Sequence, residues 1–466
     1  MKKSIDRRTF MQNTSGVLAS CLIGTTCVGA RGLTGVQKLK QIKIEQVGAN
    51  FEREQLIPYR FKGGATTDKW TGIACLKSES GIRKVGLGPQ GTLWSDGNVA
   101  RAHTEAGANA LMFSISEYAL QLIKGETFTD PIQLQEHIFP EVYAYAKQVT
   151  QNPELSKTFA LNALVSVDNA AWLLFAAENN FATFDDMVPA QFRQGIGEKH
   201  KGVASIPSFP TGTKIEKLVA AVDAGFFVLK LKIGAAGTQE EMLDKDKQFM
   251  TELHRAIGSR ETKYTSNGKI PYYFDANGRY HKKETLLRLL DHAKKIRAFD
   301  QIAVLEEPFP EPYEANVGDM GVRVASDESC HTVEEAERRI EMGYNAFAVK
   351  AIAKTLSMTL KIAQLAYEKG IPCFCADLTV GPILAEWNKN IAARLPLFPG
   401  VGVGLQETNG HQYYKEWDKL MSYHPSKNAE WVVARDGVFH TGASFYEQSG
   451  GIFMPSDHYE AMFEHL

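Results

Sequence analysis

The sequence is poor in cysteine, and the few cysteines that it has form no metal-binding pattern. Two of the six, Cys21 and Cys27, lie close to the N-terminus, and the other four include no Cys-x-x-Cys pair of the kind that binds zinc. Cys373 and Cys375 lie two residues apart in an expected strand, so their side chains share a face and are expected to pack in the core. Cysteine chemistry is therefore not expected to define the function.

The sequence also lacks an excess of charge of either sign. Its 52 Lys and Arg residues are balanced by 54 Asp and Glu residues, which gives a formal net charge of -2. No general attraction to nucleic acid or to an anionic membrane follows, so no nucleic-acid partner is expected and any anion site must be local. The hydrophobic share of 44% is ordinary for a globular protein. A chain of 466 residues suits one large barrel with an accessory domain, or two or three domains.

The first thirty residues differ from the rest of the chain. A twin-arginine pattern at residues 6–11 precedes a weakly apolar stretch, 16–30, that is too short and too polar to span a bilayer. We expect residues 1–30 to be a Tat export signal, with a periplasmic or otherwise exported location and no transmembrane span. Residues 18–21 resemble a lipoprotein processing box, with Cys21 as the candidate for lipid anchoring. A basic N-terminus without a targeting role is the alternative.

Two patterns divide the remaining chain. Residues 40–124 alternate between hydrophobic and polar positions and contain many turn residues, and we predict a small α+β domain over residues 40–160. From about residue 203 to residue 405 short apolar runs alternate with amphipathic helical segments, and we predict an α/β domain with parallel strands over residues 161–406. Eight strands are expected, and eight favour a closed barrel: 203–209, 227–233, 272–277, 303–308, 323–328, 346–351, 372–378 and 400–406. Catalytic groups then belong at the carboxyl ends of the strands.

Carboxylates end three consecutive strands of this expected barrel. They are Asp275, Glu306 and Asp327. Because they converge at one end of the barrel, they repel one another unless a cation lies among them, and hard oxygen ligands favour Mg²⁺, with Mn²⁺ as a substitute. These three residues are the predicted metal ligands. A metal ion there can bind a substrate carboxylate and stabilise the enolate that forms when the adjacent carbon loses its proton.

Lysines end the strands on either side of the carboxylates. Lys230 and Lys232 project from the same face of the second strand, and Lys350 ends the sixth. A lysine beside another ammonium group is shifted toward its neutral form, so Lys232 beside Lys230 is a candidate base. With Lys232 and Lys350 on opposite sides of the ring, one can remove a proton while the other returns one, which gives epimerisation. One lysine acting alone is the alternative.

At these residues the sequence resembles the enolase superfamily, in the mandelate racemase-like branch that contains muconate lactonizing enzyme and the dipeptide epimerases. The resemblance covers residues 40–406 and includes Lys-x-Lys at 230–232, Asp-x-Asn at 275–277, Glu-Glu-Pro at 306–308 and Asp-Glu at 327–328. It implies a modified (β/α)7β TIM-type barrel with an α+β N-terminal capping domain. Residues 407–466 would complete that capping domain.

The resemblance also implies a role for each residue. Lys232 would be an acid/base that Lys230 assists, Lys350 would be the opposite acid/base, and the three carboxylates would bind the metal. Asn277 and Glu328 would have secondary roles. A small-molecule carboxylate is the expected substrate, and a homo-oligomer is the expected assembly.

Two features depart from the family pattern. After the sixth strand the chain has a second lysine, Lys354, and no glycine pair, so Lys354 competes with Lys350 for the acid/base role. The eighth strand lacks the paired aspartates with which dipeptide epimerases hold the substrate amino group. Asp377 and Glu407 are the candidates to replace them.

Three functions stay open on the sequence. The first is a racemase or epimerase of dipeptides, L-Ala-D/L-Glu-like substrates among them, or of N-substituted amino acids. The second is a lyase, namely a sugar-acid dehydratase, a cycloisomerase or an o-succinylbenzoate synthase-like enzyme, and the third is a binding protein that has lost catalysis. The substrate would be selected by a loop after Phe51, by the region near Trp94 and by the ends of the last two strands.

Overall fold

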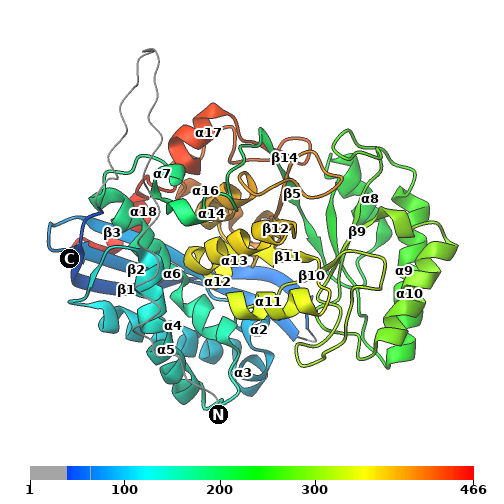
Figure 1. The fold of residues 1–466 in the computed structure, drawn as a ribbon, viewed down its shortest axis with the longest axis horizontal. Helices are drawn as coiled ribbons and strands as arrows, with labels where there is room; N and C mark the ends of the chain where they lie inside the picture. Colours follow the sequence, from blue (N-terminus) through cyan, green and yellow to red (C-terminus); the bar gives the residue numbers. More distant parts are fainter. Residues whose placement is uncertain (1–38, 63) are drawn as a thin grey trace, which may run out of the picture. The chain divides into compact units, whose positions relative to one another are not determined.

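The computed structural model describes residues 39–62 and 64–466 of the chain. The predicted export signal, residues 1–30, and its Cys21 lie outside this part. Within the described part, a four-stranded antiparallel sheet is followed along the chain by a larger, mainly parallel sheet (Figure 1).

A long hairpin forms most of the antiparallel sheet. Its strands β1 (Ile42–Phe61) and β2 (Gly64–Ser78) pair with each other, and the sheet order is β3-β2-β1-β4, with β3 (Arg83–Pro89) and β4 (Thr127–Phe128) at the edges. The pairing of β1 with β2 is interrupted just before Tyr59. Pro58 lies at this interruption, and proline has no backbone N–H to donate to a neighbouring strand.

Helices cover this sheet, and the longest of them lies against it. They are α2 (Thr92–Ser95), α3 (Gly97–Ala102), α4 (Glu105–Ile123), α5 (Pro131–Thr150), α6 (Lys157–Glu178) and α7 (Phe184–Met187). A Cβ atom at Gly86 of β3 would lie 2.3 Å from the backbone of α6 at Ser166 and Ala170, so only glycine fits there. Among the described helices, α6 alone is long and apolar enough to cross a membrane by length and composition, and 100% of that stretch is buried inside the protein.

The second sheet closes into a barrel of eight strands. Its parallel strands are β5 (Gly202–Ile206), β6 (Ser208–Phe209), β7 (Leu229–Lys232), β8 (Tyr272–Asp275), β9 (Ile302–Glu306), β10 (Val324–Ser326), β11 (Ala346–Val349), β12 (Cys373–Cys375) and β13 (Gly404–Glu407). β5 and β6 are halves of one strand around Pro207, and since β5 pairs with β13 and β6 with β7, this strand joins the two ends of the sheet. The eight predicted strands and the α/β barrel fold are thus confirmed.

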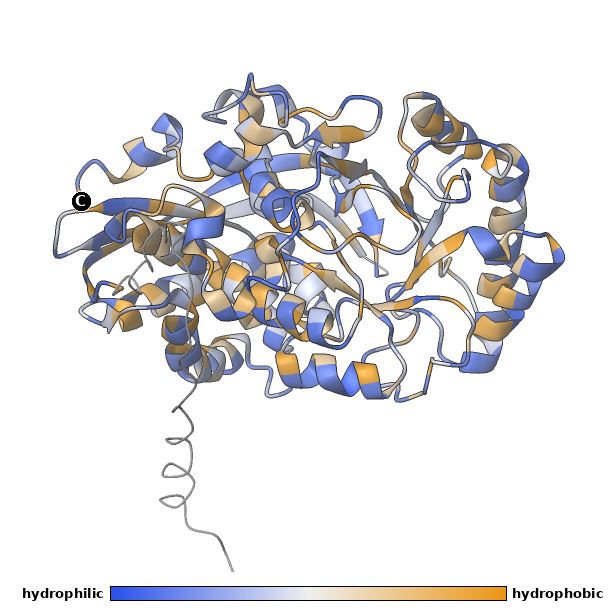
Figure 2. Ribbon diagram, turned by 45° about the horizontal axis from the view of Figure 1, so that its top comes forward, coloured by the Kyte–Doolittle hydropathy of each residue, from blue (hydrophilic) through white to orange (hydrophobic). Residues whose placement is uncertain are grey.

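Helices connect most of the barrel strands. They are α8 (Ile215–Asp223), α9 (Gln239–Ile257), α10 (Lys283–Lys295), α11 (Val333–Glu341), α12 (Ala351–Lys354), α13 (Leu356–Glu368) and α14 (Pro382–Ala392). On α9 and α10 hydrophobic and hydrophilic residues alternate, as expected of helices that face the barrel on one side (Figure 2). No α-helix lies between β9 and β10 in the described chain, because Pro308, Pro310 and Pro312 interrupt the start of that connection.

The chain then returns to the antiparallel sheet. Its last elements are α15 (Gly410–Tyr413), α16 (Trp417–Ser422), β14 (Val438–His440), α17 (Ala443–Gln448) and α18 (Asp457–Glu460). β14 adds to the barrel sheet antiparallel to β5, and Glu460 of α18 forms an ion pair with Arg83 of β3 at 3.2 Å. Residues 40–466 form one compact unit, so the boundaries proposed inside it remain predictions.

Candidate active site

The structure brings all of the sequence-predicted site residues to one end of the barrel. Each lies at the carboxyl end of its strand or within three residues of it: Lys230 and Lys232 on β7, Asp275 and Asn277 at β8, Glu306 on β9, Asp327 and Glu328 after β10, Lys350 after β11 and Asp377 after β12. This is the edge at which barrel enzymes hold their catalytic groups. Eight of these nine side chains are buried, and Asn277 is partly buried.

Lys230 lies at the centre of a buried ionic network. Its Nζ atom is 2.9 Å from Glu306, 3.0 Å from Asp275 and 3.0 Å from Glu407. Burial acts to lower the pKa of Lys230, but the three carboxylates outweigh burial and raise this pKa well above its ordinary value. Lys230 is therefore held as a positive charge among these carboxylates, and its predicted role of assisting Lys232 stays a prediction.

Lys232 and Lys350 occupy opposite sides of the site. Lys232 Nζ lies 2.5 Å from Asp275 Oδ2, and Lys350 Nζ lies 2.6 Å from Asp327 Oδ2. Their strands β7 and β11 are four positions apart in the ring of eight. Both side chains line the same pocket.

Lys354 is less favourably placed than Lys350. It contacts Asp327, with its Nζ atom 3.4 Å from Oδ1 and donating to the backbone carbonyl, but it is not among the residues that line the pocket. Trp94 also contacts Asp327, because its Nε1 donates to Oδ2 at 3.1 Å, and the Trp94 ring lies 4.3 Å from Lys350 Nζ. Trp94 is thus part of the pocket wall. The site geometry separates two lysines that the sequence left in competition.

Three carboxylates are arranged to hold a metal ion. Oxygen atoms of Glu306, Asp327 and Glu328 lie within 4.8 Å of one another. Asp327 Oδ1 and Glu328 Oε2 are buried and form no hydrogen bond. Burial, together with the nearby charge of Asp275, raises the pKa of Glu306 well above its ordinary value. Buried carboxylate oxygens that lie this close together, two of them without a hydrogen bond, fit a divalent cation such as Mg²⁺.

The cluster differs from the predicted ligand set at one position. Glu328 is in it, whereas Asp275, the third predicted ligand, has its Oδ2 within 3.0 Å of Lys230 and 2.5 Å of Lys232. Asn277 donates to Glu328 Oε1 at 2.8 Å, as suits a secondary role, and Lys62 of the hairpin lies 3.3 Å from the same oxygen. Both acidic residues therefore stay candidates for the third ligand.

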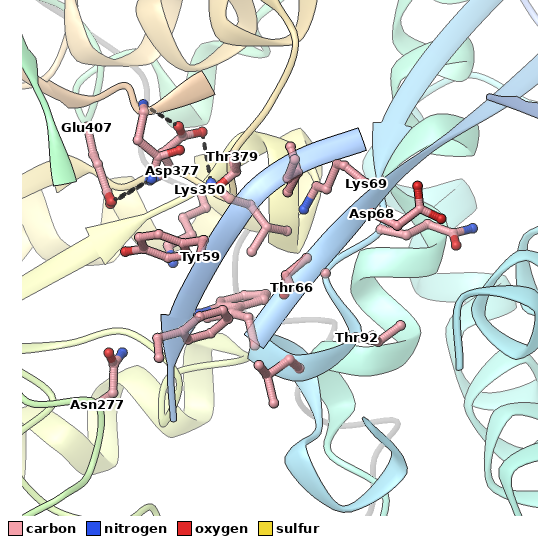
Figure 3. Close-up of a pocket in the computed structure, with 18 of the residues that line it drawn as sticks. Tyr59, Thr66, Asp68, Lys69, Thr92, Asn277, Lys350, Asp377, Thr379 and Glu407 are labelled. Atoms are coloured by element: carbon pink, nitrogen blue, oxygen red, sulfur yellow. Dashed lines mark hydrogen bonds between the residues drawn. The ribbon is translucent and has the colours of Figure 1, made fainter. Parts of the chain in front are cut away.

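Asp377 and Glu407 lie side by side but differ in their partners. Glu407 is paired with Lys230 and accepts a hydrogen bond from the Asp377 backbone N–H at 2.9 Å. The Asp377 carboxylate accepts only from the backbone N–H groups of Leu378 and Asn409 and has no cationic partner among the described residues (Figure 3). Burial, followed by the charge of Glu407, raises the pKa of Asp377 to about 7. Asp377 is thus a carboxylate available to a ligand in the pocket.

The pocket is lined by the barrel and by the N-terminal sheet together. It holds about 640 Å³ of empty space, counting its open mouth. The expected loop after Phe51 does not exist, since β1 continues to Phe61. Instead the far half of the hairpin reaches the site and supplies Leu56, Tyr59, Phe61, Thr66, Asp68 and Lys69 to the pocket wall.

Sequence reasoning missed these hairpin residues. Tyr59 donates to or accepts from Ser208 of β6 at 2.8 Å, which attaches the hairpin to the barrel. Lys69 and Lys62 look like ordinary polar positions of a strand and a turn. The interruption at Pro58 was the signal available in the sequence, because it shows that β1 does not form one regular edge.

The comparisons with known proteins agree with this geometry. Residues 214–421, which contain most of the barrel, match the family model described as enolase C-terminal domain-like. This part of the chain therefore belongs to the enolase superfamily. No curated protein sequence is similar enough to match the chain.

Solved structures share the fold at low identity. An enolase-superfamily member from Listeria innocua has a TM-score of 0.59 and 19% identity, with 80% of this chain and 88% of the other covered. A dipeptide epimerase from Enterococcus faecalis, complexed with Mg and the dipeptide L-Leu-L-Tyr, has a TM-score of 0.56 and 18% identity over 80% and 99%. The L-Ala-D/L-Glu epimerase from Bacillus subtilis has a TM-score of 0.56 and 14% identity over 80% and 91%. At these identities the likeness shows the fold.

Proposed function

We propose that the protein is a Mg²⁺-dependent racemase or epimerase that moves the proton beside a substrate carboxylate. The observation that carries the proposal is the placement of Lys232 and Lys350 on opposite strands of one ring, both facing one pocket. A carbon held between them has a lysine on each face. One lysine removes the proton and the other returns one from the opposite side, which inverts the centre.

The remaining charged residues would support this reaction. Mg²⁺, or Mn²⁺ as a substitute, would be held by Glu306 and Asp327 together with Asp275 or Glu328, and when bound would stabilise the negative charge that develops on the substrate carboxylate. Lys230, kept positive by its carboxylates, adds a fixed positive charge on the same side of the pocket.

The substrate class we propose is a dipeptide or a related amino acid derivative, with L-Ala-D/L-Glu-like dipeptides included. Asp377 supports this because it is a buried carboxylate that lines the pocket and lacks a cation. An ammonium group is the natural partner for such a carboxylate. The Enterococcus and Bacillus structures, which share the fold, are a dipeptide epimerase and a dipeptide-acting L-Ala-D/L-Glu epimerase.

A lyase of the same superfamily is the second candidate. The observation that favours it is the position of Lys350, which besides its ion pair with Asp327 lies 4.3 Å from the centre of the Trp94 ring, a cation–π contact that suits a lysine whose role is to hold charge. In that case Lys232 alone would remove the proton. A sugar-acid dehydratase, a cycloisomerase and an o-succinylbenzoate synthase-like enzyme all fit this description.

Exchange of the α-proton tests the proposal. Dipeptides, N-acyl amino acids and sugar acids are incubated in D2O with Mg²⁺, and mass spectrometry follows the uptake of deuterium by the wild type, Lys232→Ala and Lys350→Ala. Lys361→Ala, which removes a lysine at the surface that pairs with Glu136, is the matched control. Exchange with inversion that both site variants lose supports two-base epimerisation. Loss of water from the substrate, or activity that survives without Lys350, supports a lyase.

A further inference from the structure

Lys69 of β2 is a buried lysine without a partner. Its side chain lines the pocket and the residue is only 4% exposed. Its ammonium group forms no hydrogen bond or ion pair with any residue of the described chain, whereas the site lysines Lys230, Lys232 and Lys350 each bond to a carboxylate. A buried ammonium group that lacks a counter-charge is unfavourable for the folded state. A buried lysine of this kind is therefore expected to have a functional role.

The charged groups around Lys69 do not supply that partner. Burial lowers the pKa of Lys69 to about 7, Asp377 and Glu105 act against this shift, and Lys350 adds to it. The carboxylate of Glu105 is occupied by the backbone N–H and the hydroxyl of Thr67, at 2.9 and 2.6 Å. Lys69 lies on the hairpin side of the pocket and Asp377 on the barrel side (Figure 3). The space that faces the ammonium group of Lys69 is therefore the pocket itself.

We propose that Lys69 binds a second anionic group of the substrate, apart from the carboxylate next to the reacting carbon. This inference rests on the proposed function and narrows it to substrates with two carboxylates. The second carboxylate belongs either to the side chain of the residue that is epimerised or to the N-acyl end. The hairpin would then take part in substrate selection, and the barrel end would perform the proton transfer.

Pairs of substrates that differ by one charge test this role. L-Ala-L-Glu is compared with L-Ala-L-Gln, and an N-succinyl amino acid with its succinyl monoamide, in the wild type, Lys69→Met and Lys69→Arg. Lys43→Met, on the neighbouring strand and half-exposed, controls for the loss of a lysine as such. The wild type is expected to favour the charged member of one pair by about 10- to 100-fold in kcat/KM, mainly through KM, because a charge-assisted bond is lost with the neutral member. The pair that shows the preference locates the second carboxylate.

The variants decide whether Lys69 causes the preference. Lys69→Met should abolish it by weakening the charged substrate alone, and Lys69→Arg should retain most of it. Equal losses with both members of each pair, or a preference that Lys69→Met leaves intact, would overturn the inference.

Binding without turnover separates this inference from the proposed function. Calorimetry of the same pairs with Lys232→Ala and with Lys232→Ala/Lys69→Met requires no proton transfer. Charge-selective binding that depends on Lys69, in a wild type that exchanges no α-proton, would keep the inference and reject the epimerase. Exchange of the α-proton without any preference for the charged substrate would support the epimerase and reject the role of Lys69.

Discussion

At the scale of single residues, the site is a set of buried charges, most of which form ion pairs with one another. Lys230 is paired with three carboxylates, and Lys232 and Lys350 with one each. In the acidic cluster Asp327 Oδ1 and Glu328 Oε2 form no hydrogen bond, and on the two walls of the pocket Asp377 and Lys69 form no ion pair with any described residue. Two of the predictions below follow from these unsatisfied groups.

The first concerns the metal ligands. We expect Mg²⁺ to raise the melting temperature of the protein and a chelator to reverse this, because the ion relieves repulsion in the acidic cluster. Glu306→Gln and Asp327→Asn should each weaken Mg²⁺ binding about 10- to 100-fold or more. Comparison of Asp275→Asn with Glu328→Gln by calorimetry then identifies the third ligand.

Glu314→Gln, an exposed carboxylate on the β9–β10 connection, is the control for this series, and its Mg²⁺ affinity should equal that of the wild type. A wild-type protein whose melting temperature does not respond to Mg²⁺ or Mn²⁺ would contradict the metal site.

The second prediction concerns pH and Lys69. The pKa of Lys69 is about 7 in the folded protein and 10.5 ordinarily, so the folded state binds this proton less well than the unfolded state does. The contribution of Lys69 to stability is present above pH 10.5 and is lost as the pH falls to about 7. Lys69→Met removes the proton site, so without a ligand it should be more stable than the wild type by about 1–3 kcal/mol at pH 7, a gap that narrows as the pH rises toward 10.5. Denaturant unfolding at several pH values measures this gap.

If Lys69 only stabilises the fold, the difference in stability between Lys69→Met and the wild type should have the opposite sign. Lys69→Met would then be less stable than the wild type at pH 7, and the difference would not vary with pH between 7 and 10.5.

At the scale of secondary-structure elements, the barrel was predictable from the sequence and the hairpin was not. A parallel strand that is buried on both faces must be a short apolar run, and each barrel strand has this pattern. The carboxyl end of each strand, and the charged residue there, can therefore be located in the sequence. The course of β1 across the barrel mouth depends on long-range contacts such as Tyr59 with Ser208, which local pattern does not contain. For this reason the candidate site residues at the strand ends could be predicted from the sequence, whereas Lys69 could not.

The packing of β3 against α6 gives a prediction at this scale. Gly86→Ala would place a Cβ atom 2.3 Å from the backbone of α6, and backbone cannot move aside as a side chain can. We expect a loss of about 1–3 kcal/mol in the free energy of unfolding. Gly72→Ala is the control in the same sheet, because its nearest neighbouring atom is 3.6 Å from the new Cβ and its φ is not positive. Similar stabilities for the two variants, measured by denaturant unfolding, would contradict this account of the contact.

At the scale of the whole molecule, the site is complete only when the chain is folded. The pocket is lined by β1 and β2 of the N-terminal sheet and by residues as far along the chain as Asn409. The proposed metal ligands come from β9, from the segment after β10 and, if Asp275 is the third ligand, from β8. A protein of this kind is well suited to export after folding and metal loading, which is what the Tat route provides. The expected homo-oligomer stays a prediction at this scale.

The twin-arginine pattern tests the export proposal directly. Arg7→Lys/Arg8→Lys preserves the charge of the N-terminus but removes the paired guanidinium groups, so we expect the protein to remain inside the cell, with the folded part unaffected. Fractionation of cells that express each form measures the share of the protein that is exported. Cys21→Ala tests the lipid anchor in parallel. If Cys21 carries a lipid, the Cys21→Ala protein should be exported but released from the membrane fraction. Equal export of the double-lysine variant would show that the arginine pair does not direct export and that residues 1–30 are not a Tat signal, and retention of the wild type inside the cell would reject export altogether.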